Sequence, residues 1–150
     1  MKLLEKILIK ILMKLNINQF NFGFTRNKDK SLYLSIHKKA QTNISNEVTN
    51  FENLTGYKID STYLSNLSLH TQVVIKKTPI NLNHGRVLYT MLRKYIDNNK
   101  YKFQDAGICI IETGTARGFS SICMSKALID SKMSGKIFTI DIIPHNTKMY

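Results

Sequence analysis

The second half of the chain alternates continuous apolar runs with segments of helical spacing. Residues 106–114 contain the apolar run Ile108–Ile111, which is typical of a strand buried on both faces of a parallel sheet. Residues 119–133 place apolar side chains at helical spacing, and residues 136–143 return to the pattern of a buried strand. Four side chains of the helix are expected to face inward: Ile122, Cys123, Ala127 and Leu128. Strand, glycine turn, helix and strand make a βαβ unit, which predicts a right-handed crossover and a parallel sheet.

Residues 71–99 lead into this unit. The β-rich run over 71–77 predicts a short strand that Pro79 stops. Residues 84–99 then repeat apolar positions at helical spacing, which predicts a helix with Asn83 as its N-cap.

Residues 16–70 are polar and rich in asparagine, and their pattern is weaker. A short helix is predicted within 43–54, because Ser45 is a good N-cap and Gly56 a good stop signal. We expect the rest to be an irregular or helical lead-in. The predicted organisation is therefore an amphipathic segment over 1–15, a polar lead-in over 16–70 and the start of a larger domain over 71–150.

Residues 1–15 place a lysine at every fourth position, opposite a face of leucine and isoleucine. That pattern predicts an amphipathic helix with a basic face. Three roles fit it: a terminal helix docked on its own domain or on a partner subunit, a helix lying on a membrane surface, and a mitochondrial-type presequence. The stretch has neither the arginine nor the serine of such presequences, which favours docking or membrane-surface contact in a cytoplasmic protein.

The 150-residue chain has a formal net charge of +12, but this charge does not indicate a nucleic-acid-binding protein. Its few arginines are spread from Arg26 to Arg117, whereas a nucleic-acid reader uses clustered arginine for bidentate contacts. A solvated lysine-rich surface explains the charge. Cys109 and Cys123 lie in apolar sequence and are expected to be reduced core residues. Three histidines show no metal-ligand spacing: His37, His70 and His84.

The turn between the predicted strand and helix carries the candidate chemistry. Gly114 allows the chain to reverse and lets a ligand approach the backbone closely. The first amides of the helix after Gly118 point outward at the positive end of the helix dipole, which suits a phosphate or a carboxylate. Asp141 ends the second strand, where an acidic side chain accepts hydrogen bonds from ribose hydroxyls. These features predict a nucleoside-containing ligand.

Glu112 narrows the choice of ligand. The glycine spacing G-x-x-x-G is neither the dinucleotide fingerprint G-x-G-x-x-G nor the phosphate loop G-x-x-x-x-G-K-[ST]. A carboxylate just before the turn would repel a pyrophosphate and suits a ligand with a cationic amine. A nicotinamide dehydrogenase is therefore only a minor alternative. Arg117, in the same turn, is expected to be solvated.

The pattern E-x-G-T-x-x-G-F-S over 112–120, followed by Asp141, resembles the S-adenosylmethionine-dependent methyltransferases of the Rossmann-like class. Within that class it is most similar to the catechol- and caffeoyl-CoA-type O-methyltransferase branch and its bacterial relatives. The segment from Lys77 to Arg86 is similar to that branch's lead-in to the first strand. The resemblance covers about residues 71–145. It departs from the common pattern at Ala116, where a glycine is usual.

The resemblance implies S-adenosylmethionine as the cofactor and gives roles to the residues of the turn. Glu112 would face the methionyl ammonium, and the backbone of Gly114 and Thr115 would line the methionine. The hydroxyl of Ser120 and the helix-start amides that follow Gly118 would hold the methionine carboxylate.

At the other end of the ligand, the resemblance implies that Asp141 holds the ribose and that Ile142 packs on the adenine. The implied function is methyl transfer to an oxygen of a small molecule or sugar. No catalytic residue and no metal ligand is assigned within the chain. A divalent metal would take its ligands from beyond residue 150.

The expected fold is α/β: a Rossmann-like doubly wound parallel sheet, incomplete because only its first βαβ unit is present, preceded by a helical amino-terminal region. Such a sheet needs more strands after Asp141, so the chain is interpreted as the amino-terminal fragment of a longer enzyme, inactive alone, with uncovered apolar surface on its strands. The alternative is a non-enzymatic module that contacts a membrane or a partner through residues 1–15 and carries a vestigial βαβ unit. The expected partner is a small-molecule methyl acceptor, and no nucleic acid.

Overall fold

The computed structural model describes residues 29–75, 78–103 and 106–142. This part of the chain is mixed α/β and mostly helical, with one two-stranded parallel sheet. Its elements, in chain order, are α2 (Lys30–Gln41), α3 (Asn46–Thr55), α4 (Ser61–Thr71), α5 (Asn83–Asn98), α6 (Lys100–Phe103), β1 (Ile108–Thr113), α7 (Phe119–Asp130) and β2 (Gly135–Ile140).

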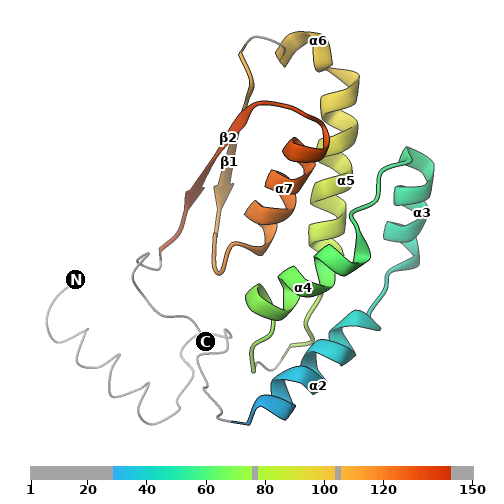
Figure 1. Ribbon diagram of the computed structural model, residues 1–150, viewed down its shortest axis with the longest axis vertical. Coiled ribbons are helices and arrows are strands. Elements are labelled where there is room, and N and C mark those ends of the chain that lie inside the picture. Colours follow the sequence, from blue (N-terminus) through green and yellow to red (C-terminus); the bar gives the residue numbers. More distant parts are fainter. Residues whose placement is uncertain (1–28, 76–77, 104–105, 143–150) are drawn as a thin grey trace, which may run out of the picture.

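The predicted βαβ unit is confirmed. β1 and β2 are parallel, in a register that runs from Ile108 opposite Gly135 to Thr113 opposite Ile140, and α7 is the crossover between them. α7 packs between the sheet and α5 (Figure 1). Of the other helices, α3 packs against α5, α4 against α7, and α2 against α4. The carboxyl ends of both strands therefore meet at one edge of the sheet.

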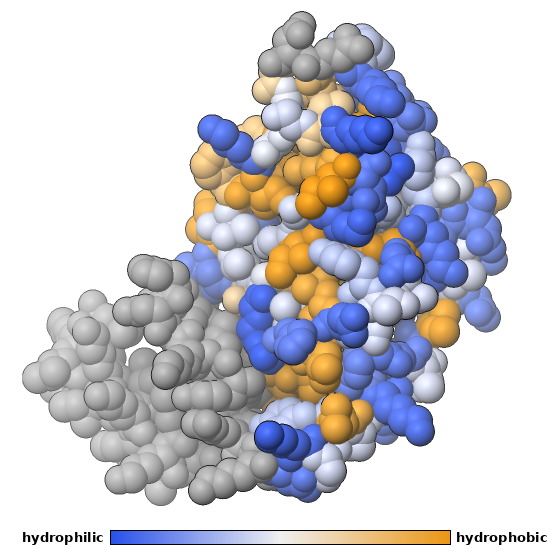
Figure 2. Space-filling view, viewed as in Figure 1, coloured by the Kyte–Doolittle hydropathy of each residue, from blue (hydrophilic) through white to orange (hydrophobic). Residues whose placement is uncertain are grey.

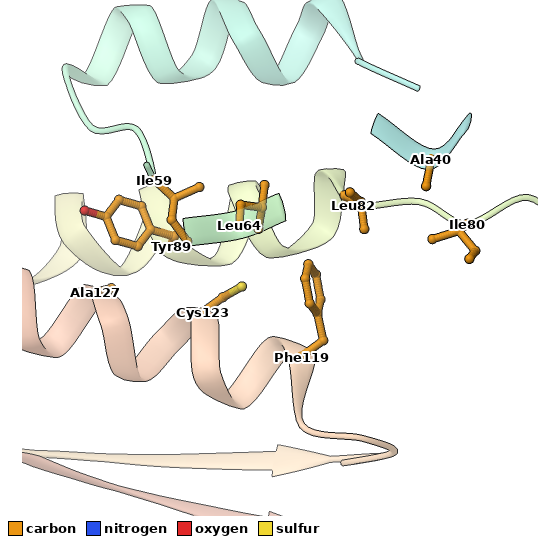
Figure 3. Close-up of a cluster of buried hydrophobic side chains, with 9 residues drawn as sticks. All are labelled: Ala40, Ile59, Leu64, Ile80, Leu82, Tyr89, Phe119, Cys123 and Ala127. Carbon is orange, nitrogen blue, oxygen red and sulfur yellow. The ribbon is translucent and has the colours of Figure 1, made fainter. Parts of the chain in front are cut away.

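Two apolar clusters hold the helices to each other and to the sheet. The larger one joins the start of α5 to α7 and to the helices below them, and Figure 3 shows Phe119 and Cys123 pointing from α7 toward α5. Its buried members are Ala40, Ile59, Leu64, Ile80, Leu82, Tyr89, Phe119, Cys123 and Ala127. The smaller cluster lies between the end of α5 and the sheet, around Ile96, Ile108 and Leu128. Ile122, predicted to face inward, is exposed instead, and Met124 is buried in its place.

The sheet is covered on one face only within the described residues. Side chains of Ile108 and Ile110 face α7, but Ile111 is 70% exposed and its partner Phe138 is 54% exposed. Cys109 lies on this outer face and is exposed, so its prediction as a core residue is wrong. The apolar runs predicted burial of the strands on two faces, which the described residues do not show. The exposed face agrees instead with the uncovered apolar surface that was predicted for an incomplete sheet. Figure 2 shows apolar side chains at the surface over the strands.

The short helix predicted around residues 43–54 is confirmed as α3, with both of its signals. The hydroxyl of Ser45 accepts a hydrogen bond from the amide of Val48 at 3.2 Å, and Gly56 ends the helix with φ +75°. The lead-in was expected to be irregular or helical; α2 and α4 are helices whose positions were not predicted. Each begins after an aspartate, Asp29 and Asp60, whose carboxylate caps the first helical turn.

Two local predictions on either side of Pro79 are wrong. The described part of the run over 71–77, residues 71–75, is not a strand: Thr71 ends α4, and of these residues only Ile75 takes part in an isolated β-bridge. Asn83 is not the N-cap of α5 but its first residue, and the amide of Asn83 donates to Oδ1 of Asn81 at 2.8 Å. The side chain of Asn83 is buried among other polar groups.

The amphipathic segment 1–15 lies outside the described residues, as does the last part of the apolar run over 136–143. None of the helices in the described part of the chain has the length and apolar character needed to cross a bilayer.

Candidate functional site

The glycine turn follows β1 and has three residues in the left-handed region. Gly114 has φ +82° and Gly118, the N-cap of α7, has φ +80°. Both values favour glycine because a Cβ clashes with the backbone there. A Cβ on Gly114 would meet no atom within 4 Å, so the space beside this residue is open among the described atoms. The turn therefore offers an accessible backbone surface at the carboxyl edge of the sheet.

Ala116 has φ +47°, which explains why glycine is usual at this position of similar turns. For an L-residue this conformation costs about 1–2 kcal/mol. The turn is stabilised from the second strand, because Oδ2 of Asp141 accepts a hydrogen bond from the amide of Ala116 at 2.7 Å. Asp141 thus reaches the turn from the end of β2.

Glu112 lies near the end of β1, on the face that α7 covers. Its two carboxylate oxygens accept hydrogen bonds from the hydroxyls of Ser120 and Ser121, in the first turn of α7. The carboxylate of Glu112 therefore lies at the amino end of α7, where the helix dipole favours negative charge. Ser121 was not among the predicted site residues. The signal available for it was a second small hydroxyl residue directly after Ser120.

Arg117 is half-buried and hydrogen-bonded, whereas the sequence predicted a solvated side chain. Its guanidinium donates to the carbonyl oxygen of His70 at 2.7 Å and to that of Val73 at 3.1 Å, both at the carboxyl end of α4. Burial of the half-buried side chain lowers the pKa of Arg117 below its ordinary value. The turn is therefore attached to the helical layer as well as to the sheet.

The structure brings most of the predicted site residues together at one edge of the sheet. Glu112 and Asp141 lie at the ends of adjacent parallel strands, and the turn lies between the first strand and α7. The carbonyl of Thr115 accepts a hydrogen bond from the amide of Gly118 at 2.8 Å, which closes the turn. Ile142 is 91% exposed and contacts none of the apolar clusters. An adenine ring that stacked on Ile142 would cover it.

The start of α5 packs against the first turn of α7, which follows the glycine turn. The rings of His84 and Phe119 pack with their centroids 4.8 Å apart. A Cβ on Gly85 would lie 2.5 Å from Cε1 of Phe119 and 2.8 Å from Sγ of Cys123. Gly85 therefore allows a close approach of α5 to α7 that fixes where α7 begins.

The described residues of this region form no metal site, and the buried thiol behind the turn is not activated. Among the described residues, no group of three or more His, Cys, Asp and Glu side chains is placed to bind a metal ion. Burial raises the pKa of the Cys123 thiol to about 12, so this cysteine is not a nucleophile at neutral pH.

A second polar cluster, which no sequence pattern predicted, lies between α3 and α5. Arg86 forms a bidentate ion pair with Glu52, at 2.9 Å from Nε to Oε1 and 2.6 Å from Nη2 to Oε2. The remaining guanidinium contacts are with Oδ1 of Asn83 at 3.0 Å and Oγ1 of Thr49 at 2.9 Å. A cavity of about 560 Å³ borders the cluster, between α2, α3, α4 and the start of α5. Because Glu52 neutralises Arg86, the cluster is interpreted as structural.

Comparison of the chain with family models, with curated proteins and with solved structures gives no match in any of the three.

Proposed function

We propose that the chain binds S-adenosylmethionine at the glycine turn and belongs to a methyltransferase with a Rossmann-like sheet. The observation that carries the proposal is the pair of carboxylates, Glu112 and Asp141, at the ends of adjacent parallel strands on either side of that turn. In open parallel sheets ligands bind outside the carboxyl ends of the strands, next to the helix that follows the first strand.

The charges of the site favour this ligand over a dinucleotide. Glu112 lies at the amino end of α7, where a pyrophosphate would bind, and its carboxylate would repel the two negative charges. An ammonium group next to Glu112 would instead be stabilised. Asp141, held 2.7 Å from the amide of Ala116, is at the strand end where ribose hydroxyls are bound in such sheets.

The bound sulfonium would supply an electrophilic methyl group to an oxygen of a small-molecule acceptor. For this reaction the residues of the turn bind and orient, and positioning supplies much of the rate enhancement in such a transfer. Glu112 would orient the ammonium, and Asp141 would fix the ribose. No residue of the chain is assigned as the base that receives the acceptor's proton.

Calorimetry of the 150-residue chain with S-adenosylmethionine, S-adenosylhomocysteine and NAD tests the proposal. We expect binding of both adenosyl-sulfur ligands and none of NAD. Asp141→Asn should weaken binding by about 1–3 kcal/mol, because buried ribose hydroxyls lose a charged acceptor. Glu47→Gln, an exposed carboxylate at the start of α3, is the matched control and should bind normally. NAD binding without adenosyl-sulfur binding would contradict the proposal.

The exposed outer face of the sheet favours a second candidate, a non-enzymatic module that associates with a partner. Ile111, Phe138 and Ile140 form an apolar surface there that no described residue covers. In this alternative, residues 1–15 would provide a membrane or partner contact. Sedimentation with anionic and neutral vesicles distinguishes the cases: salt-sensitive binding to anionic vesicles together with no adenosyl-sulfur binding would favour this candidate, since each lysine near the surface contributes about 1 kcal/mol.

A further inference from the structure

Arg117 connects two parts of the molecule that are far apart in the chain. It lies in the glycine turn, and its guanidinium reaches the carbonyl oxygens of His70 and Val73, which are 47 and 44 residues away. A cation at this end of α4 interacts favourably with the helix dipole and satisfies carbonyls that have no partner within the helix. Among the described residues, no carboxylate forms an ion pair with Arg117.

The contact holds a turn whose backbone is strained. The preceding residue, Ala116, has φ +47° and is held from the other side by Asp141. Strained backbone of this kind persists only where the surrounding structure fixes it. Two consecutive residues of the turn are therefore held from two sides: Ala116 by Asp141 at the end of β2, and Arg117 by the carboxyl end of α4.

We propose that Arg117 is a positioning residue that couples the glycine turn to the carboxyl end of α4. The ligand part of this inference rests on the proposed function. A ligand that orders the turn then also orders the end of α4. By reciprocity, loss of order at the end of α4 lowers the affinity of the turn for the ligand. Arg117 would not itself contact the ligand.

The end of α4 offers a direct measurement of this coupling. The amides of Gln72 and Val73 both donate to the carbonyl oxygen of Ser68, at 2.8 and 3.2 Å, so their hydrogen exchange reports on whether this last turn is intact. The amides of 114–118 report on the turn itself.

The experiment compares Arg117→Gln with the wild-type 150-residue chain, with and without S-adenosylhomocysteine. Without ligand, we expect exchange to rise about tenfold in both segments, 68–73 and 114–118. With ligand, we expect wild type to gain protection in both segments and Arg117→Gln to lose the gain at 68–73, together with an affinity about tenfold lower.

Arg93→Gln is the matched control. Arg93 is also partly buried and contacts Tyr89 and Asp130, but it lies on α5, away from the turn. We expect Arg93→Gln to lower the melting temperature without changing affinity or the exchange of the turn. If Arg117→Gln does not fold, Arg117→Lys replaces it, because an ammonium keeps the charge but loses the planar fork that reaches both carbonyls.

Unchanged exchange at 68–73 in the Arg117 variants, or an equal rise in Arg93→Gln, would overturn the coupling. If wild type binds no adenosyl-sulfur ligand, the proposed function fails, while the exchange of the ligand-free chains still decides whether Arg117 couples the two segments.

Discussion

Gly85→Ala adds a single methyl group at the closest approach of α5 to α7. The new Cβ would lie 2.5 and 2.8 Å from two ring atoms of Phe119 and 2.8 Å from Sγ of Cys123. These distances are far shorter than van der Waals contact, so something must move. Phe119 is 1% exposed and Cys123 is fully buried, so both side chains lie inside the core.

Two opposing effects set the size of the change. Alanine is favoured over glycine inside a helix by about 1 kcal/mol. Overpacking a filled core costs about 1–3 kcal/mol and more where backbone must shift. Since three contacts are violated at once, we place the cost at the upper end and expect a net loss of about 1–2 kcal/mol in the free energy of unfolding.

Urea unfolding of the two chains measures this difference. With a slope of about 2 kcal/mol per molar, the midpoint should fall by roughly 0.5–1 M. Phe119→Leu supplies the control, because it removes the ring atoms that the new methyl group meets. In a double-mutant cycle, Gly85→Ala should cost much less in the Phe119→Leu background. A Gly85→Ala chain as stable as wild type, or one whose loss is the same in both backgrounds, would refute the packing argument.

Four further predictions follow from single contacts. Glu52→Ala should lower the free energy of unfolding by about 3–5 kcal/mol, because it leaves the guanidinium of Arg86 buried without its partner. The double variant Glu52→Leu with Arg86→Met should recover most of the lost stability, because it buries no charge. A loss below about 1 kcal/mol for Glu52→Ala in urea unfolding would contradict the prediction. Burial, and then the hydrogen bond to Asp130, raises the pKa of Tyr89 from 10.0 to about 12. The tyrosine of the unfolded chain therefore ionises at a lower pH than that of the folded chain, and the free energy of unfolding should fall by about 2–3 kcal/mol from pH 10 to 12. Tyr89→Phe should make the melting temperature less dependent on pH over this range, and an unchanged pH dependence would contradict the prediction. An alkylating reagent should modify the exposed Cys109 in the native chain and Cys123 only after unfolding, as mass spectrometry of the labelled peptides would show; equal labelling of both would contradict the burial. Ala116→Gly should raise stability by up to about 1 kcal/mol in thermal unfolding, because relief of the positive φ exceeds the entropy that glycine loses, and a clear loss of stability would show that the turn is not strained.

Local signals in the sequence determined several elements of this protein. Ser45 and Gly56 predict both ends of α3, because capping depends on residues within one helical turn. The apolar runs around Ile108 and Ile137 and the glycine turn between them predict the βαβ unit with parallel strands, because the pattern of apolar positions is also local. The placement of the two carboxylates of the candidate site also follows from position, since Glu112 and Asp141 lie at the carboxyl ends of the two strands of one βαβ unit.

Other features depend on contacts between distant parts of the chain, which local pattern does not encode. α4 consists mainly of serine, threonine and other residues of modest helix propensity. Both α2 and α4 gain stability from packing their apolar side chains on the rest of the molecule. The ion pair of Arg86 with Glu52 joins residues 34 apart, and Arg117 reaches carbonyls more than 40 residues away. Apolar runs predict strands, but which face of the sheet is covered is decided by where the helices pack, and Ile111 and Phe138 lie on the uncovered face. The sequence alone thus specified elements and strand ends, whereas tertiary structure decided burial, charge pairing and the support of the turn.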